Sequence, residues 1–80
     1  MGDQLTLEEA AGEFVSQALQ AADDPSREKF TAHLSRERFR MPIDVSKQDK
    51  LVALVKKKAE DNNLKMSGRT PTEFIFVRAS

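Results

Sequence analysis

Residues 46–64, SKQDKLVALVKKKAEDNNL, combine an apolar stripe with five lysines. The stripe recurs at spacings of three and four residues, which is typical of a helix that buries one side. Its members are Leu51, Leu54, Val55 and Ala59. Ser46 followed by Asp49 indicates the helix start, and Asn62-Asn63 indicates its end, because asparagine tolerates the left-handed conformation that often closes helices. The stretch therefore predicts one amphipathic helix with a basic exposed side.

The N-terminal part of the chain predicts a second long helix. Thr6 and Glu9 have the spacing of a capping box, in which each residue's side chain accepts a hydrogen bond from the other's backbone N–H. An apolar stripe with helical spacing follows over residues 7–21. Its members are Leu7, Ala10, Ala11, Phe14, Val15, Ala18, Leu19 and Ala22.

A short third helix is expected directly after it, over residues 25–35. Asp24 is a suitable N-cap, and Pro25 suits the first helical position, where its missing N–H costs nothing. Phe30 and Leu34 would form the apolar pair of this helix.

Three segments have the pattern of strands. In residues 38–42, Phe39 and Met41 alternate with arginines, and Pro42 ends the run. Residues 64–68 and 73–79 read as an antiparallel pair joined by the turn-rich segment GRTPTE. The expected fold class is therefore α+β: a small three-stranded antiparallel sheet with two to three helices packed on it, in the order α-α-β-α-β-β.

Length and composition indicate one small domain spanning residues 1–80. A chain of 80 residues has a single modest core, and the absence of cysteine means that packing alone must stabilise it. No segment is apolar and long enough to cross a bilayer, and the N-terminus does not resemble a signal peptide. We therefore expect an intracellular protein, nuclear or cytoplasmic.

The formal charge of zero conceals two halves of opposite sign. Residues 1–33 carry seven acidic and two basic residues, a formal −5, whereas residues 34–80 carry six acidic and eleven basic residues, a formal +5. The chain thus divides into an acidic helical part, residues 1–35, and a basic β-α-β-β part, residues 36–80. Such asymmetry indicates either a polyanionic partner or two mutually attracting faces of one domain.

The sequence contains no pattern of residues that would support catalysis or cofactor binding. His33 is the single histidine, there is no cysteine, and the acidic pairs fall at helix ends or on exposed faces. Three separated glycines cannot form a phosphate-binding loop, and the acids lack metal-ligand spacing. The expectation is a protein that is not an enzyme and has no metal or other cofactor.

The basic residues are the candidates for a binding site. On a helical wheel Lys47, Lys50 and Lys57 share one ridge beside the apolar stripe. Cations of the predicted sheet could lie next to this ridge and complete a phosphate-binding surface. These are Arg38, Arg40, Lys65 and Arg69.

The stretch from Phe39 to Arg78 resembles the R-three-H domain, a small module that binds single-stranded nucleic acid. The similarity lies in an apolar-Pro step, a Ser-x-x-Asp helix start, a helix closing near NNL, a Ser-Gly strand and a terminal I-x-V-x-R strand. In this sequence they are Met41-Pro42, Ser46 and Asp49, residues 62–64, Ser67-Gly68, and residues 75–78. The resemblance implies a three-stranded antiparallel sheet with helices packed against it.

The chain departs from the family at the motif that names it, an Arg and a His four residues apart on a helix. Lys50 stands at the Arg position and Leu54 at the His position, so the charge is retained and the imidazole is lost. Lysine contacts phosphate as a point charge, without the planar fork of arginine. The resemblance is therefore to a degenerate member of the family.

Two functional hypotheses follow from these patterns. The first is a module that contacts the backbone of single-stranded RNA or DNA, with little base reading because all five aromatic residues are phenylalanines with core-like spacing. The alternative is a protein-protein interaction domain. It would use the acidic helix 7–21 or the edge of the C-terminal strand.

Overall fold

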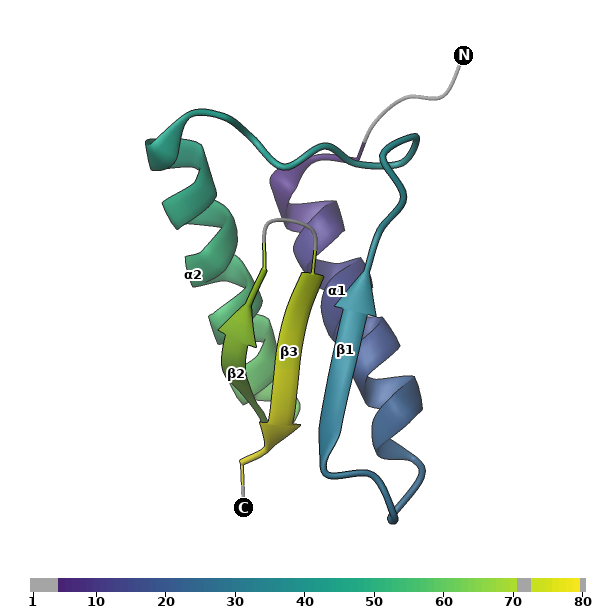
Figure 1. Ribbon diagram of the computed structural model, residues 1–80. Helices are drawn as coiled ribbons and strands as arrows, with labels where there is room; N and C mark the ends of the chain where they lie inside the picture. The colour runs from purple at the N-terminus through teal and green to yellow at the C-terminus, as the bar shows by residue number, and fades with distance from the viewer. Residues whose placement is uncertain (1–4, 71–72, 80) are drawn as a thin grey trace.

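The computed structural model describes residues 5–70 and 73–79, and in this part of the chain two helices cover one face of a three-stranded antiparallel sheet (Figure 1). The elements follow the order α1 (Leu7–Ala22), β1 (Lys29–His33), α2 (Val45–Asp61), β2 (Leu64–Arg69) and β3 (Glu73–Arg78). In the sheet the strand order is β1-β3-β2. The α+β class and the three-stranded antiparallel sheet predicted from sequence are confirmed.

The core lies between the sheet and the two helices. Phe74 and Phe76 of β3 point toward the helices and are fully buried, and Phe14 of α1 meets the Phe74 ring edge-on at a centroid distance of 4.6 Å. Ile75 and Val77 alternate with these residues and are only partly buried, on the opposite face of the sheet. The sheet therefore has one packed face and one open face.

Helix α1 begins at Leu7 as its sequence pattern predicts and ends at Ala22, one residue beyond the predicted end. The Glu9 backbone N–H donates to Thr6 Oγ1 at 3.1 Å, and the Thr6 N–H donates to Glu9 Oε1 at 3.0 Å. This reciprocal capping box satisfies two of the N–H groups that a helix start leaves without partners.

The helix predicted over residues 25–35 is wrong, because residues 29–33 form strand β1. Phe30 and Ala32 are 0% exposed and alternate with exposed neighbours, and they pair with Phe76 and Phe74 of β3. Asp24 caps a turn instead of a helix, since its Oδ1 accepts from the Ser26 N–H at 3.0 Å. Pairing with a strand distant in sequence thus outweighs a locally helical pattern.

The strand predicted over residues 38–42 is also wrong. Residues 34–44 contain a turn and no strand, and they cross from the end of β1 to the start of α2 (Figure 1). The Phe39 N–H donates to the Ser35 carbonyl at 3.0 Å, and the Phe39 ring meets Phe14 edge-on at 6.2 Å. Phe39 is therefore a buried anchor of a loop, and its position between exposed arginines gives the loop the apolar-polar alternation of a strand. The observed order of elements is therefore α-β-α-β-β.

Helix α2 starts two residues earlier than the Ser46 pattern predicts. Asp44 is the N-cap, and its Oδ1 accepts from the Ser46 N–H at 2.9 Å. The predicted end is confirmed, with Asn62 as the C-cap and Asn63 at a φ of 60°, in the left-handed region. Leu51, Val55 and Ala59 form its buried stripe, with Leu54 half-buried beside them.

The predicted pair of C-terminal strands is confirmed, although part of their connecting loop lies outside the described residues. Strand β2 pairs with β3 and carries an irregularity between Met66 and Gly68. Because β3 also pairs with β1, it is the central strand. The expectation that the C-terminal strand offers a free edge to a protein partner is therefore wrong, and the sheet edges are β1 and β2.

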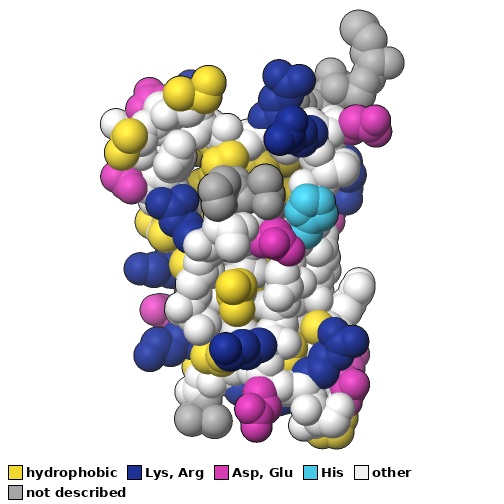
Figure 2. All heavy atoms as spheres, in the orientation of Figure 1, with side chains coloured by type: hydrophobic (Ala, Val, Ile, Leu, Met, Phe, Trp, Pro, Cys, Tyr) yellow, Lys and Arg dark blue, Asp and Glu magenta, His cyan; other side chains and the backbone are white. Residues whose placement is uncertain are grey.

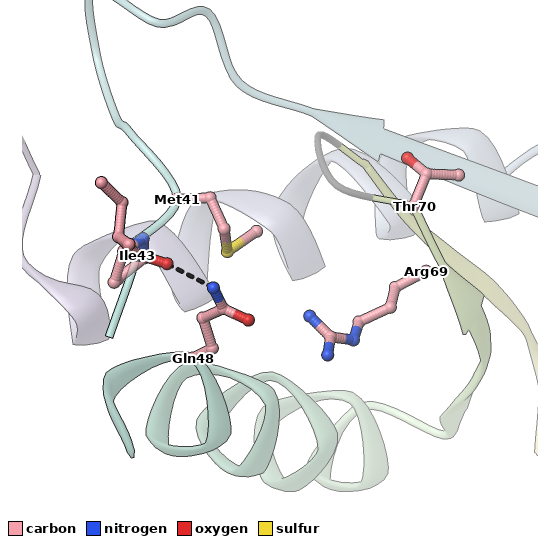
Figure 3. A pocket seen from close by; sticks show the side chains of 6 residues that line it. Met41, Ile43, Gln48, Arg69 and Thr70 are labelled. Atoms are coloured by element: carbon pink, nitrogen blue, oxygen red, sulfur yellow. Dashed lines mark hydrogen bonds between the residues drawn. The ribbon is translucent and has the colours of Figure 1, made fainter. Parts of the chain in front are cut away.

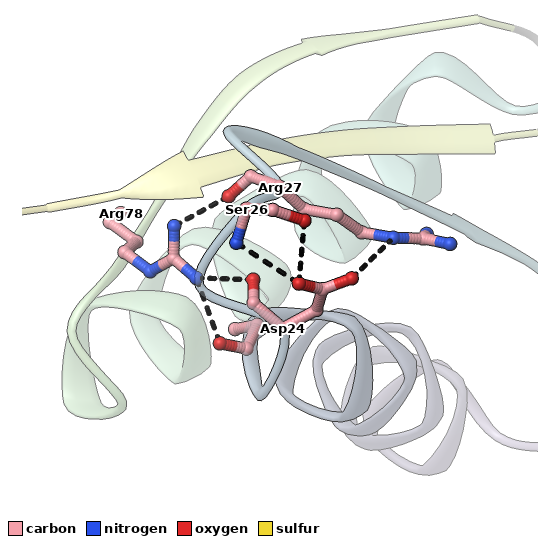
Figure 4. A network of polar contacts seen from close by, with 5 residues as sticks. Asp24, Ser26, Arg27 and Arg78 are labelled. Carbon is pink, nitrogen blue, oxygen red and sulfur yellow. Dashed lines mark hydrogen bonds and ion pairs between the residues drawn. The ribbon is translucent and has the colours of Figure 1, made fainter.

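Arg78 joins the end of α1 to the last strand (Figure 4). Its guanidinium donates to the carbonyls of Ala22, Asp24 and Arg27 at 2.8, 2.9 and 2.5 Å, and lies 4.9 Å from the centre of the Phe30 ring. These carbonyls belong to the end of α1 and the turn after it, where a cation complements the helix dipole. Hydrogen bonds from the Ser26 hydroxyl and backbone N–H lower the pKa of Asp24 in the same turn.

The position of the α2 cap gives a first prediction. Replacing Asp44 with Ala removes the acceptor of the Ser46 N–H and should lower the free energy of unfolding by about 1 kcal/mol in urea denaturation. Ser46→Ala is the matched control and should change it by less than about 0.5 kcal/mol. The reverse order of effects would place the cap at Ser46.

The Arg78 contacts give a second prediction. Arg78→Met keeps much of the side-chain volume but removes three hydrogen bonds and the cation over Phe30, and should lower the free energy of unfolding by about 1–2 kcal/mol. Lys65→Met, at an exposed strand position, serves as the control. An equal free energy of unfolding for the two variants would show that the contacts of Arg78 with the end of α1 do not stabilise the fold.

Candidate nucleic-acid interface

The end of the molecule that carries the N-termini of both helices contains two adjoining hollows. Residues 34–44, which we name the crossing segment, run between the two helix ends. Side chains of this segment line both hollows. The first hollow, of about 850 Å³, lies between the end of β1 and the crossing segment; the second, of about 590 Å³, lies between the crossing segment, α2 and the end of β2 (Figure 3). Met41 and Ile43 line both hollows, and we therefore describe them together as the crossing groove.

Contacts at both ends and in the middle hold the crossing segment in place. Gln17 of α1 binds both backbone groups of His33, accepting from its N–H at 2.9 Å and donating to its carbonyl at 2.7 Å. Phe39 is 7% exposed against Phe14, and Gln48 Nε2 donates to the Pro42 carbonyl at 2.5 Å. A loop fixed in this way presents its remaining side chains in defined positions.

Three arginines line the groove with their charges uncompensated. Arg36 and Arg40 come from the crossing segment and Arg69 from the end of β2. All three are exposed, and none of their side chains makes a hydrogen bond or ion pair with another residue of the described ranges 5–70 and 73–79. Arg69 lies opposite Phe74 in the register, on the helix side of the sheet, and in Figure 3 its guanidinium points toward α2.

The other cations predicted to form the site lie elsewhere. Arg38 forms an ion pair with Glu13 of α1 at 3.3 Å, and Lys65 lies opposite Val77 on the open face of the sheet. Lys47, Lys50 and Lys57 are exposed on α2 outside the residues that line the groove. In the view of Figure 2, basic side chains lie over several separate parts of the molecule, with acidic side chains between them. Of the seven predicted residues, the groove brings together Arg40 and Arg69.

The residues predicted from sequence do not include the groove residues His33, Arg36 and Ile43. His33 fell in the segment assigned to a helix over residues 25–35, and Arg36 lies directly after that segment. The available signal was the alternation of Arg36, Arg38 and Arg40, with Phe39 between the last two, since an apolar anchor between cations is consistent with a strand or with an anchored loop.

The two family motif positions lie on α2. Lys50 is exposed in its second turn, and Leu54 is half-buried next to the apolar stripe. Comparison with protein-family models, curated proteins and solved structures finds no significant match to this chain. Membership of the R-three-H family therefore stays a prediction that rests on the sequence motifs.

The described ranges 5–70 and 73–79 add two negative findings. Neither helix in them is long and apolar enough to cross a membrane. Within the same ranges, no group of three or more histidine, aspartate or glutamate side chains is placed to hold a metal ion.

The anchoring of the crossing segment gives a third prediction. Gln48→Ala removes the hydrogen bond to Pro42 and should speed amide hydrogen exchange at Ile43 and its neighbours, while lowering the free energy of unfolding by about 1 kcal/mol. The control is Gln20→Ala, because the Gln20 side chain makes no hydrogen bond to the described residues. Unchanged exchange at residues 41–44 would mean that Gln48 does not hold the segment.

Proposed function

We propose that this protein is a non-catalytic module that binds single-stranded RNA or DNA, with the phosphate backbone held at the crossing groove. The observation that carries the proposal is the group of three arginines without an ionic partner among the described residues, Arg36 and Arg40 at the first hollow of the crossing groove and Arg69 at the second. The proposal keeps the ligand class expected from the sequence and moves its centre from the α2 ridge to the groove.

The chemistry of arginine suits this ligand. A guanidinium is planar, always charged and weakly hydrated, and it donates two parallel hydrogen bonds to a phosphate. Side chains that have no partner among residues 5–70 and 73–79 can make these bonds without breaking others there. Arg38, by contrast, is already compensated by Glu13.

The lysines of α2 have a supporting role in this proposal. Lys47 lies in the first turn of α2, next to Gln48 of the groove lining, and Lys50 and Lys57 continue along the exposed side. Exposed lysines raise the local concentration of a polyanion and extend its path, with an effect that salt screens. An RNA or DNA ligand is consistent with the intracellular location, nuclear or cytoplasmic, that the sequence suggests.

A titration of labelled single strands tests the proposal and is the fourth prediction. Fluorescence anisotropy should show binding of short single-stranded RNA or DNA at low salt. Arg36→Ala with Arg40→Ala should reduce the slope of log K against log salt by about 1.4, because each phosphate contact to a single strand contributes roughly 0.7.

The matched control removes two cations away from the groove, by Lys29→Ala with Lys56→Ala. Both side chains are exposed and lie outside the groove lining. The control pair should retain most of the affinity. Absence of binding at low salt, or equal losses in the two double variants, would overturn the proposal.

A further inference from the structure

Ile43 is the most exposed large hydrophobic residue in the described part of the chain. It is 96% exposed and Val45 is 68% exposed, and these two are the exposed large hydrophobic side chains among residues 5–70 and 73–79. They differ in position, since Ile43 lines both hollows of the crossing groove and Val45 lines neither. An isoleucine that lines a groove and is open to water costs free energy that a ligand can recover by covering it.

The groove has an apolar side and a cationic side. Met41 and Ile43 come from the crossing segment, whereas Arg69 reaches toward α2 from the other side of the second hollow (Figure 3). Phe39, the aromatic residue of the crossing segment, lines the first hollow but is 7% exposed, so its ring cannot stack on a ligand. Any apolar contact in the groove must therefore be made by aliphatic side chains.

A single nucleic-acid strand likewise combines a charged part with a part of low polarity. Its phosphates are charged, and its unpaired bases present flat faces of low polarity, which a duplex hides by pairing and stacking. From this correspondence we infer that Ile43, supported by Met41, is a base-contacting residue of the groove, and that the site binds unpaired bases as well as phosphates. The inference rests on the proposed function and goes beyond it, because the arginines by themselves would bind only the backbone.

The charges around the groove favour a strand as the occupant. The uncompensated arginines lie on both sides of Ile43 along the chain, with Arg36 and Arg40 before it and Arg69 across the second hollow. A nucleic-acid strand places a phosphate on every nucleotide and a base beside each phosphate, so one ligand satisfies both kinds of contact.

The fifth prediction compares a ten-nucleotide thymidine strand with an abasic strand of the same length, in which every base is absent. Both carry the same phosphates, so the difference in their affinities reports contacts to the bases. Wild-type protein should bind the thymidine strand several-fold more tightly. Ile43→Ala should weaken binding of the thymidine strand about fivefold through lost apolar contact, and leave binding of the abasic strand unchanged.

Val45→Ala is the matched control, because it shortens an exposed β-branched side chain just outside the groove. It should leave both affinities at the wild-type values. Since Ile43 and Val45 are largely exposed, both variants should fold normally, and urea denaturation checks that they do.

Three results would overturn the inference while leaving the proposed function intact. They are equal wild-type affinity for the two strands, an equal loss on both strands in Ile43→Ala, and an equal effect of Val45→Ala. Binding of neither strand at low salt would remove the proposed function and the inference together. Discrimination of bases that disappears only in Ile43→Ala would support the inference.

Discussion

The pairing of β1 with β3 is the constraint on which the rest of this structure depends. Residues 29–33 come between the two helices in sequence, yet they pair with residues 73–77 near the C-terminus. This pairing buries Phe30 and Ala32 against the helices and makes β3 the central strand. Because β1 ends and α2 begins at the same end of the molecule but on opposite sides of it, the chain must cross past the helix ends, and this crossing creates the groove (Figure 1).

The crossing segment also determines how the positive charge is distributed. The basic half of the sequence does not form one basic face, because some of its cations have structural partners. Arg78 joins α1 to β3 through three backbone carbonyls, and Arg38 pairs with Glu13. The acidic front segment thus compensates part of the basic half within the fold. In the proposed function, a polyanion contacts the groove arginines that have no ionic partner among the described residues.

The resemblance to the R-three-H domain and the groove point to the same class of ligand through different residues. The family motif positions, Lys50 and Leu54, lie on α2, and Leu54 is half-buried and apolar. The groove instead uses side chains of the crossing segment and of β2. A chain with leucine at the position of the motif histidine can therefore still be proposed as a nucleic-acid-binding module, on chemistry that does not need an imidazole.

Local sequence patterns determined both long helices and the C-terminal strand pair, because caps, apolar stripes and turn residues act between near neighbours in the chain. Only the tertiary structure decided that residues 29–33 form a strand and that residues 38–42 do not. For Phe30 the helical spacing to Leu34 and the alternation with Ala32 were both present, and its distant partner Phe76 selected the strand. For Phe39, the alternating pattern came from one buried anchor with exposed arginines on either side. The groove depends on both outcomes, and for that reason Arg40 and Arg69 could be named from the sequence, but their convergence with Arg36 around Ile43 could not.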